Sequence, residues 1–121
     1  MKNFKNATVY VGGEGLKKCT VCFDEKIEKI SRCKVDGAEE IVLPDGAIVL
    51  PGFVDQHIHG AGGSDGMDGT VEDISIIAKT VAAEGTTSFL VTTMTQSPEN
   101  ITKAMQAVKP IRRQTRKRAR G

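Results

Sequence analysis

The sequence predicts an α/β protein in which a small strand-rich part precedes a part built from alternating strands and helices. Two observations predict this fold class. Residues 1–50 carry short apolar and β-branched runs that are separated by turns containing Gly or Pro. From residue 51 onward the pattern changes to strand, helix, strand, helix, which is the order typical of a parallel sheet covered by helices.

The first part is expected to be a meander of short strands, suited to a small sheet or sandwich. The expected strands cover residues 7–12, 16–24 and 26–33, and two further apolar runs cover residues 41–43 and 47–50. Pro44, Asp45 and Gly46 lie between these last two runs and predict a turn, because Pro restricts φ and Gly accepts a positive φ. Ile27 and Ile30 are expected to be buried.

The second part opens with a strand over residues 52–59, which runs into a Gly-rich loop. A helix should then begin after Thr70 as N-cap, with Asp73 placed as in a capping box, and end at Gly85. Its apolar face comprises Ile74, Ile77, Ala78 and Val81.

A second strand, residues 86–93, has a continuous apolar centre that favours burial on both of its faces. The segment 97–110 predicts a second helix, with Ser97 as N-cap, Pro98 in its first turn and Pro110 at its end. The apolar face expected for this helix comprises Ile101, Ala104, Met105 and Val108.

The lengths of the apolar runs and the cysteine content indicate in which compartment the protein is expected. No apolar run approaches the roughly 18 residues of a membrane span, and the N-terminus lacks the apolar core of a signal peptide, so we expect a cytoplasmic protein. The three cysteines are Cys19, Cys22 and Cys33, and this odd number favours reduced thiols. The CxxC formed by Cys19 and Cys22 lacks a second pair and favours plain strand thiols over a metal or redox site.

The candidate metal ligands are His57 and His59, which are the only two histidines of the chain. Side chains two residues apart on a strand point to the same side, with Cα atoms roughly 6.6 Å apart, so both imidazoles can converge on one cation. Asp55 shares that side and could orient a ligand, whereas Val54 and Ile58 should point into a layer covered by helices. The alternative is that both rings are structural.

The Gly-rich loop has two interpretations. Gly60, Gly62 and Gly63 resemble a loose phosphate-binding GxGxxG, but the third glycine does not fit the spacing. We favour the interpretation that these glycines let the chain leave the strand without crowding the histidines. Asp65 and Asp68 in the same loop are possible further metal ligands.

Three segments carry a family resemblance. LPGFVDQHIHG, residues 50–60, resembles the first-strand signature of the amidohydrolase superfamily. GAGGSDGMDG, residues 60–69, and EGTTSFLVTTMTQSPENI, residues 84–101, resemble the N-acetylglucosamine-6-phosphate deacetylase family within it. The similarity covers about residues 4–111 and does not extend into the tail.

The resemblance implies a fold, a cofactor and a reaction. Residues 1–50 would form the first half of a small β-sandwich, and residues 51–111 the first two βα units of an incomplete (β/α)8 barrel. His57 and His59 would bind a divalent metal ion, zinc or iron. The reaction would remove the acetyl group from N-acetylglucosamine 6-phosphate, a small-molecule amino-sugar phosphate, giving glucosamine 6-phosphate and acetate.

The chain by itself is expected to be an inactive, truncated fragment, because a barrel of this type needs about 250 residues and the family's later ligands and catalytic aspartate are absent. We assign no catalytic and no substrate-binding residue to it, and we expect neither a membrane nor a nucleic acid as partner. Whether the chain forms a homo-oligomer as in the family stays open. Alternatives are another amidohydrolase, of the dihydroorotase or hydantoinase kind, and a non-catalytic fragment or interaction module.

The last ten residues differ in composition from the rest. Residues 112–121 carry six basic and no acidic side chains, whereas residues 1–111 carry 11 basic and 15 acidic ones. The tail could be an arm for nucleic acid or an acidic surface, the product of a damaged coding frame, or an ordinary solvated end. We favour the second interpretation and expect this tail to be disordered.

Overall fold

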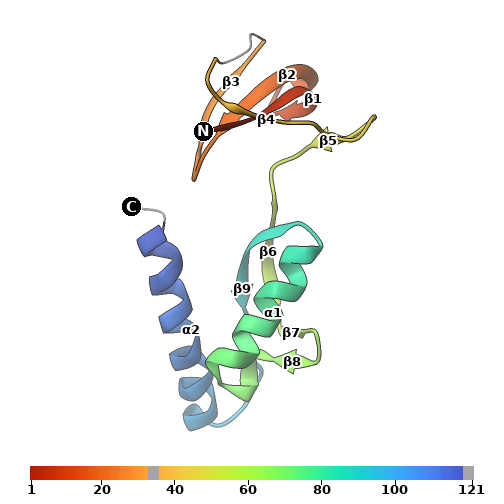
Figure 1. The fold of residues 1–121 in the computed structure, drawn as a ribbon. Coiled ribbons are helices and arrows are strands. Elements are labelled where there is room, and N and C mark those ends of the chain that lie inside the picture. Colours follow the sequence, from red (N-terminus) through yellow and green to blue (C-terminus); the bar gives the residue numbers. More distant parts are fainter. Residues whose placement is uncertain (33–35, 119–121) are drawn as a thin grey trace. The chain divides into compact units, whose positions relative to one another are not determined.

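The computed structural model describes residues 1–32 and 36–118, and their side chains for residues 1–5, 7–32 and 36–111. Cys33 and residues 119–121 of the basic tail therefore lie outside the described residues. The chain divides into two compact units, Met1–Pro51 and Gly52–Gly121 (Figure 1). Within the part that the structure describes, no helix has the length and apolar character needed to cross a membrane.

The first unit is a single five-stranded sheet with the order β3-β2-β1-β4, in which β5 also pairs with β1. Its strands are β1 (Lys2–Val11), β2 (Gly15–Phe23), β3 (Ile27–Ser31), β4 (Glu39–Ile41) and β5 (Ile48–Val49). The strands β1, β2 and β3 pair in antiparallel fashion, and β4 and β5 pair parallel to β1. The predicted turn after residue 43 is confirmed, because the Ala47 N–H donates to the Pro44 carbonyl at 3.1 Å and Gly46 has a φ of +78°.

The core of this sheet lies on β1 and β2, not on β3. Its buried residues are Ala7, Val9, Cys19 and Val21. Cys19 and Cys22 are buried thiols without a disulfide. The predicted burial of Ile27 and Ile30 is wrong, since they are 67% and 45% exposed. The reason is that β3 is the outermost strand of the sheet, where neighbours cover it on one edge only.

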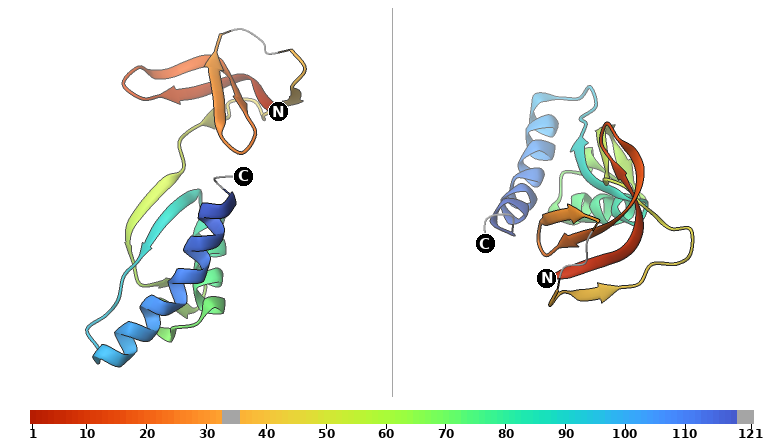
Figure 2. Two further views of the ribbon diagram at one scale, coloured as in Figure 1. Left: turned by 90° about the vertical axis from the view of Figure 1, so that its left-hand side faces the viewer. Right: turned by 90° about the horizontal axis from the view of Figure 1, so that it is seen from above.

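The second unit has the expected order of strands and helices, with a hairpin and one 3₁₀ turn inserted before the first helix. Its elements are β6 (Phe53–Ile58), β7 (Gly60–Ala61), β8 (Ser64–Asp65), η1 (Gly66–Asp68), α1 (Val71–Ala83), β9 (Thr86–Val91) and α2 (Pro98–Arg118). β6 and β9 pair in parallel, and Figure 2 shows them side by side. A cluster of buried residues joins the helices: Ile74, Ile77, Val81 and Ala107.

The limits of α1 are those predicted from the sequence. The Thr70 hydroxyl accepts a hydrogen bond from the Asp73 N–H at 3.1 Å, as an N-cap does. After the helix, Gly85 has a φ of +91°, and its N–H donates to the Ala82 carbonyl at 3.1 Å. Ser97 likewise caps α2, because its hydroxyl accepts from the Asn100 N–H at 3.3 Å.

The predicted end of α2 and part of its predicted apolar face are wrong. The helix continues through Pro110 to Arg118, so residues 112–118 are helical and the expected disorder of the tail is wrong for them. Among the α2 side chains that the structure describes, up to Ile111, Ala104 and Ala107 are buried, whereas Met105 is 60% exposed. Ala107 belongs to the buried cluster that joins α2 to α1, and Met105 lies outside that cluster, beside the groove along β9.

The predicted burial of β9 on both faces is also wrong for the residues that the structure describes. Phe89 and Val91 pack against the cluster between the helices, but Leu90 is 62% exposed. On β6, Ile58 packs against the same cluster as predicted, whereas Val54 is 64% exposed. This follows from the course of α1, which packs on β7, β8 and β9.

Candidate metal centre

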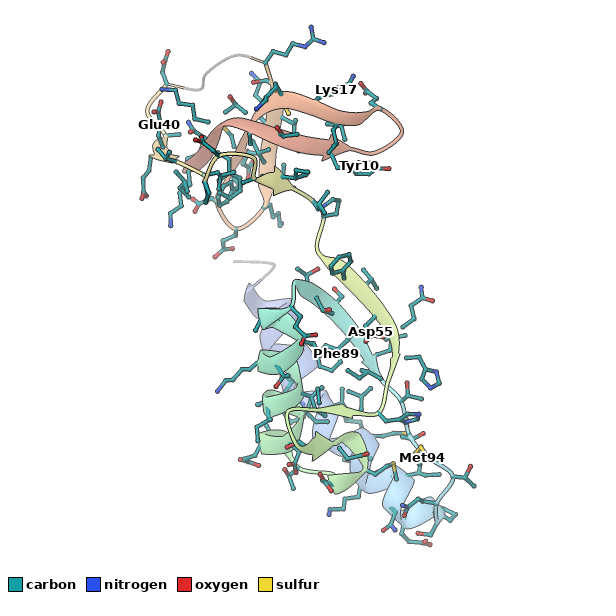
Figure 3. All side chains as sticks on the ribbon, turned by 90° about the vertical axis from the view of Figure 1, so that its right-hand side faces the viewer. Tyr10, Lys17, Glu40, Asp55, Phe89 and Met94 are labelled. Carbon is teal, nitrogen blue, oxygen red and sulfur yellow. The ribbon has the colours of Figure 1, made fainter. Side chains whose placement is uncertain are left out.

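The two histidines lie where β6 ends. His57 is in the strand and exposed, and His59 follows the last strand residue, Ile58, and is half-buried. The strand was predicted to continue through His59, but it ends one residue earlier because β7 begins at Gly60 and folds back as a hairpin. Figure 3 labels Asp55 of β6 and its register partner Phe89 of β9, which mark the strand pair that carries the histidines.

The two imidazole rings converge on a common point. Their Nε2 atoms are 3.2 Å apart, and their ring centroids are 5.0 Å apart at an interplanar angle of 85°. Two Zn–N bonds of about 2.0–2.1 Å at a tetrahedral angle would separate the nitrogens by about 3.3 Å. The pair therefore fits two adjacent positions of a tetrahedral metal shell. The same distance also fits an N–H···N hydrogen bond between the rings, which is the structural alternative.

One hydrogen bond defines which nitrogen of His59 can bind a metal. Its Nδ1 lies 2.9 Å from the main-chain oxygen of Thr92. Because a carbonyl oxygen only accepts, Nδ1 carries the proton, and the neutral ring presents a lone pair at Nε2. Metal-binding histidines are commonly held in this way by a carbonyl on the other ring nitrogen. His59 is thus oriented as a metal ligand would be.

Thr92 is itself fixed against β6. Its N–H donates to the Ile58 carbonyl at 2.8 Å, one residue before His59. The end of β9 therefore places an acceptor beside the ring through main-chain groups alone. Sequence reasoning missed this contribution, and no sequence signal identifies it, because the acting atom is a backbone oxygen 33 positions away.

Asp55 has a different partner from the one expected. Its Oδ1 accepts a hydrogen bond from the His57 N–H at 3.0 Å. The carboxylate therefore fixes the main chain of β6 where the strand is irregular, between residues 55 and 58. The expectation that Asp55 orients an imidazole ring is wrong in this structure.

The loop carboxylates are occupied by structural hydrogen bonds. Asp65 Oδ1 accepts from the Met67 N–H at 2.7 Å, and Asp68 Oδ2 accepts from the Asp65 N–H at 2.9 Å. Together they form a capping box on η1. Among the described residues, no group of three or more His, Cys, Asp or Glu side chains could hold a metal ion. Asp65 and Asp68 are therefore not placed as further ligands.

The glycines form a tight hairpin and not a phosphate loop. β7 and β8 pair in antiparallel fashion, and the two residues between them, Gly62 and Gly63, have φ values of +63° and +84°. Positive φ at both positions is typical of a type I′ turn. A phosphate loop would open directly into a helix N-terminus, whereas α1 begins only after η1 and Thr70.

A second set of hydrogen bonds connects this hairpin to α1. Asp73 accepts from the Ser64 hydroxyl at 2.9 Å and from the Thr70 hydroxyl at 2.5 Å. The Thr70 hydrogen bond first, and then that from Ser64, hold the pKa of the Asp73 carboxyl below its ordinary value. The hairpin that follows His59 is therefore hydrogen-bonded to the first turn of α1.

Comparison with known proteins identifies proteins to which this chain is similar. A model of the amidohydrolase family matches residues 48–117, which include both histidines. The chain is 43% identical over 84 residues to the N-acetylglucosamine-6-phosphate deacetylase of Bacillus subtilis (strain 168), covering 68% of this chain and 21% of that protein. The chain thus spans about a fifth of the length of that curated relative.

Two solved structures have similar folds. The N-acetylglucosamine-6-phosphate deacetylase from Pasteurella multocida superposes with a TM-score of 0.81 at 27% identity, covering 90% of this chain and 30% of that one. A D-hydantoinase superposes with a TM-score of 0.57 at 26% identity, covering 90% of this chain and 24% of that one. The family resemblance of the sequence is therefore confirmed. Because the family model covers more than half of its residues, this chain belongs to the amidohydrolase family.

Proposed function

We propose that this chain provides two metal ligands, the Nε2 atoms of His57 and His59, to a deacetylase acting in the cytoplasm. The substrate would be N-acetylglucosamine 6-phosphate, and the products glucosamine 6-phosphate and acetate. The observation that carries the proposal is the convergence of the two Nε2 atoms at 3.2 Å, with His59 held at Nδ1 by a carbonyl. The 43% identity to the Bacillus subtilis deacetylase supports the choice of substrate.

The metal would be a divalent ion, zinc or iron, since imidazole suits both. Such an ion supplies Lewis-acid chemistry, which polarises an amide carbonyl and activates water for attack. The contribution of this chain is to hold two imidazoles in a fixed relative orientation. Two ligands fill half of a tetrahedral shell, and the described residues offer no third, so we propose that residues 1–121 alone do not hydrolyse the substrate.

The second unit would form the first two βα units of a (β/α)8 barrel, and the first unit part of a β-sandwich. The parallel pairing of β6 with β9 supports this, as does an apolar groove of about 490 Å³ beside β9. This groove is lined by residues of β9 and α2, among them Leu90, Met105 and Val108. A further strand and helix with apolar side chains would cover it.

The experiment has two arms. In the first, zinc is titrated into the chain and into its H57N and H59N variants, and bound metal is measured after gel filtration. Binding by the parent chain and loss in both variants supports the centre; equal binding by all three refutes it.

In the second arm, the chain is co-expressed with the part of the Bacillus subtilis deacetylase that it does not match, and acetate release from N-acetylglucosamine 6-phosphate is measured. Release that requires both pieces and both histidines supports the reaction. Release by the chain alone refutes the proposed inactivity of residues 1–121.

A hydantoinase-like reaction is the second candidate, because the D-hydantoinase structure shares the fold. A hydantoin assayed in parallel with the co-expressed pieces separates the two. Ring opening without acetate release would favour the second candidate. A chain that binds no metal and completes no enzyme would instead be a non-catalytic fragment or interaction module.

A further inference from the structure

We propose that Gly66 and Val91 are a size-matched pair that positions His59 for metal binding. This inference rests on the proposed metal role of His59. Gly66 is buried, and its N–H donates to the main-chain oxygen of His59 at 2.7 Å. Gly66 and Val91 are thus positioning residues, which act through His59.

The space at Gly66 is occupied by Val91. A Cβ atom placed on Gly66 would lie 2.4 Å from Val91 Cγ1 and 3.2 Å from the His59 oxygen. The first of these distances is far below van der Waals contact, so one of the two residues would have to move. The φ of Gly66 lies outside the left-handed region, so an alanine there meets a steric conflict and no conformational one.

Val91 transmits this conflict to the imidazole. It directly precedes Thr92, whose N–H bonds Ile58 and whose oxygen accepts from His59 Nδ1. His59 is therefore held at two points, at its carbonyl by Gly66 and at its ring by Thr92. A Cβ on Gly66 either lengthens the first contact or displaces the end of β9, which carries the second.

Either displacement removes one of the two hydrogen bonds that hold His59. If β9 moves, the Nδ1–H of His59 loses its acceptor, and the two nitrogens exchange protons with water more freely. If Gly66 moves, the main chain of His59 loses its 2.7 Å hydrogen bond and the ring shifts with it. In both cases Nε2 of His59 no longer keeps its 3.2 Å separation from Nε2 of His57.

The geometry also predicts a second substitution that should restore the position of His59. Val91→Ala removes the Cγ1 atom that the new methyl group would meet, so Gly66→Ala should be tolerated in that background. Gly60→Ala is the matched control. Its Cβ would lie 2.2 Å from the Ser64 main-chain oxygen, which shortening Val91 cannot relieve. Rescue by V91A must therefore be specific to G66A.

The test uses the full chain labelled with ¹⁵N-histidine, in the variants G66A, V91A, G66A/V91A, G60A and G60A/V91A. The first readout, in chelator, is a His59 Nδ1–H signal protected from exchange with water. The second is the zinc dissociation constant, and the third is the midpoint of thermal unfolding.

We expect G66A to lose the protected signal and to bind zinc about 10–100-fold more weakly, the usual effect of losing a group that orients a ligand. The double variant G66A/V91A should regain the signal and bind zinc within about threefold of V91A. G60A should not be rescued. If G66A fails to fold, V91I, which enlarges the same side chain toward Gly66, should weaken the protection in a soluble protein.

An unchanged signal and zinc affinity in G66A, or a double variant no better than G66A, would overturn the inference. So would zinc affinities that simply follow the unfolding midpoints, because a purely structural role predicts that relation. The readouts separate this inference from the proposed function. If the parent chain binds no zinc, the proposed metal centre fails, while the protected Nδ1–H in chelator still decides whether Gly66 and Val91 position the ring.

Discussion

Replacing each histidine by alanine should affect folding and metal binding differently. In chelator, H59A removes the hydrogen bond from Nδ1 to Thr92, whose net contribution is about 1 kcal/mol. In a unit of this size, that loss lowers the unfolding midpoint by roughly 4–8 °C. H57A should change the free energy of unfolding by less than about 0.5 kcal/mol, because His57 is exposed and the hydrogen bond described for its ring joins it to the half-buried imidazole of His59.

In zinc, both variants should be less stable than the parent chain, whereas in chelator H59A alone should be clearly destabilised. At a free zinc concentration about 100-fold above its dissociation constant, the parent chain gains about 2.7 kcal/mol of stability from linkage. Each variant lacks one of two ligands and should gain almost nothing. The assay is thermal unfolding followed by circular dichroism, in chelator and in zinc, with Q56A as an exposed control on the same strand. Equal destabilisation by H57A and H59A in chelator, or a zinc-dependent gain that persists in either variant, would contradict these expectations.

Three further predictions concern the second unit. I77A should cost about 3 kcal/mol in urea unfolding because Ile77 is 0% exposed, whereas I76A, at a residue 42% exposed, should cost about 1 kcal/mol or less. The Thr70 hydrogen bond keeps the pKa of Asp73 low in the folded state, so its stabilising effect is complete above about pH 4 and is lost as the pH falls further. Unfolding measured between about pH 6 and 2.5 should therefore depend less on pH in D73N than in the parent chain. L90T should reduce self-association in sedimentation velocity, because Leu90 is an exposed apolar residue beside a groove, and unchanged association would contradict this.

The elements that the sequence predicts best are those whose signals are local. The start of α1 depends on the hydrogen bonds between Thr70 and Asp73, three residues apart, and its end on the positive φ of Gly85. Both are consequences of side-chain chemistry that a sequence displays directly. For the two histidines, strand periodicity predicts that residues two apart share one side, and their Nε2 atoms do lie 3.2 Å apart, although His59 follows the end of β6.

Pro110 shows how tertiary contacts override a local signal. A proline inside a helix removes one main-chain hydrogen bond and costs about 3 kcal/mol, so a helix is expected to stop there. In the structure, Val108 and Ile111 lie on either side of the proline and pack against the buried cluster of α1 and α2. Continuing the helix keeps both side chains in that contact, which offsets the local cost.

The sequence shows the two candidate ligands of the proposed site, but not the groups that hold them. His57 and His59 carry imidazole rings, which can be read directly from the sequence. Thr92 acts through a backbone oxygen, and Gly66 through an N–H and an absent side chain. Neither has a chemical signature in the sequence. Their roles depend on distances set by the packing of β9 against β6 and of the hairpin against α1.

The apolar centre of β9 is a prediction that the described residues fulfil on one face only. Phe89 and Val91 are covered by the helices, and Leu90 is 62% exposed. If further βα units cover the groove beside β9, as we propose, Leu90 becomes buried there. L90T should then have opposite effects in two settings. It should reduce self-association of the isolated chain. It should also weaken assembly of the chain with the complementary part of the Bacillus subtilis relative by about 1.5–3 kcal/mol, the usual contribution of a buried leucine side chain. Equal assembly by L90T and the parent chain would show that the groove is not where those units pack.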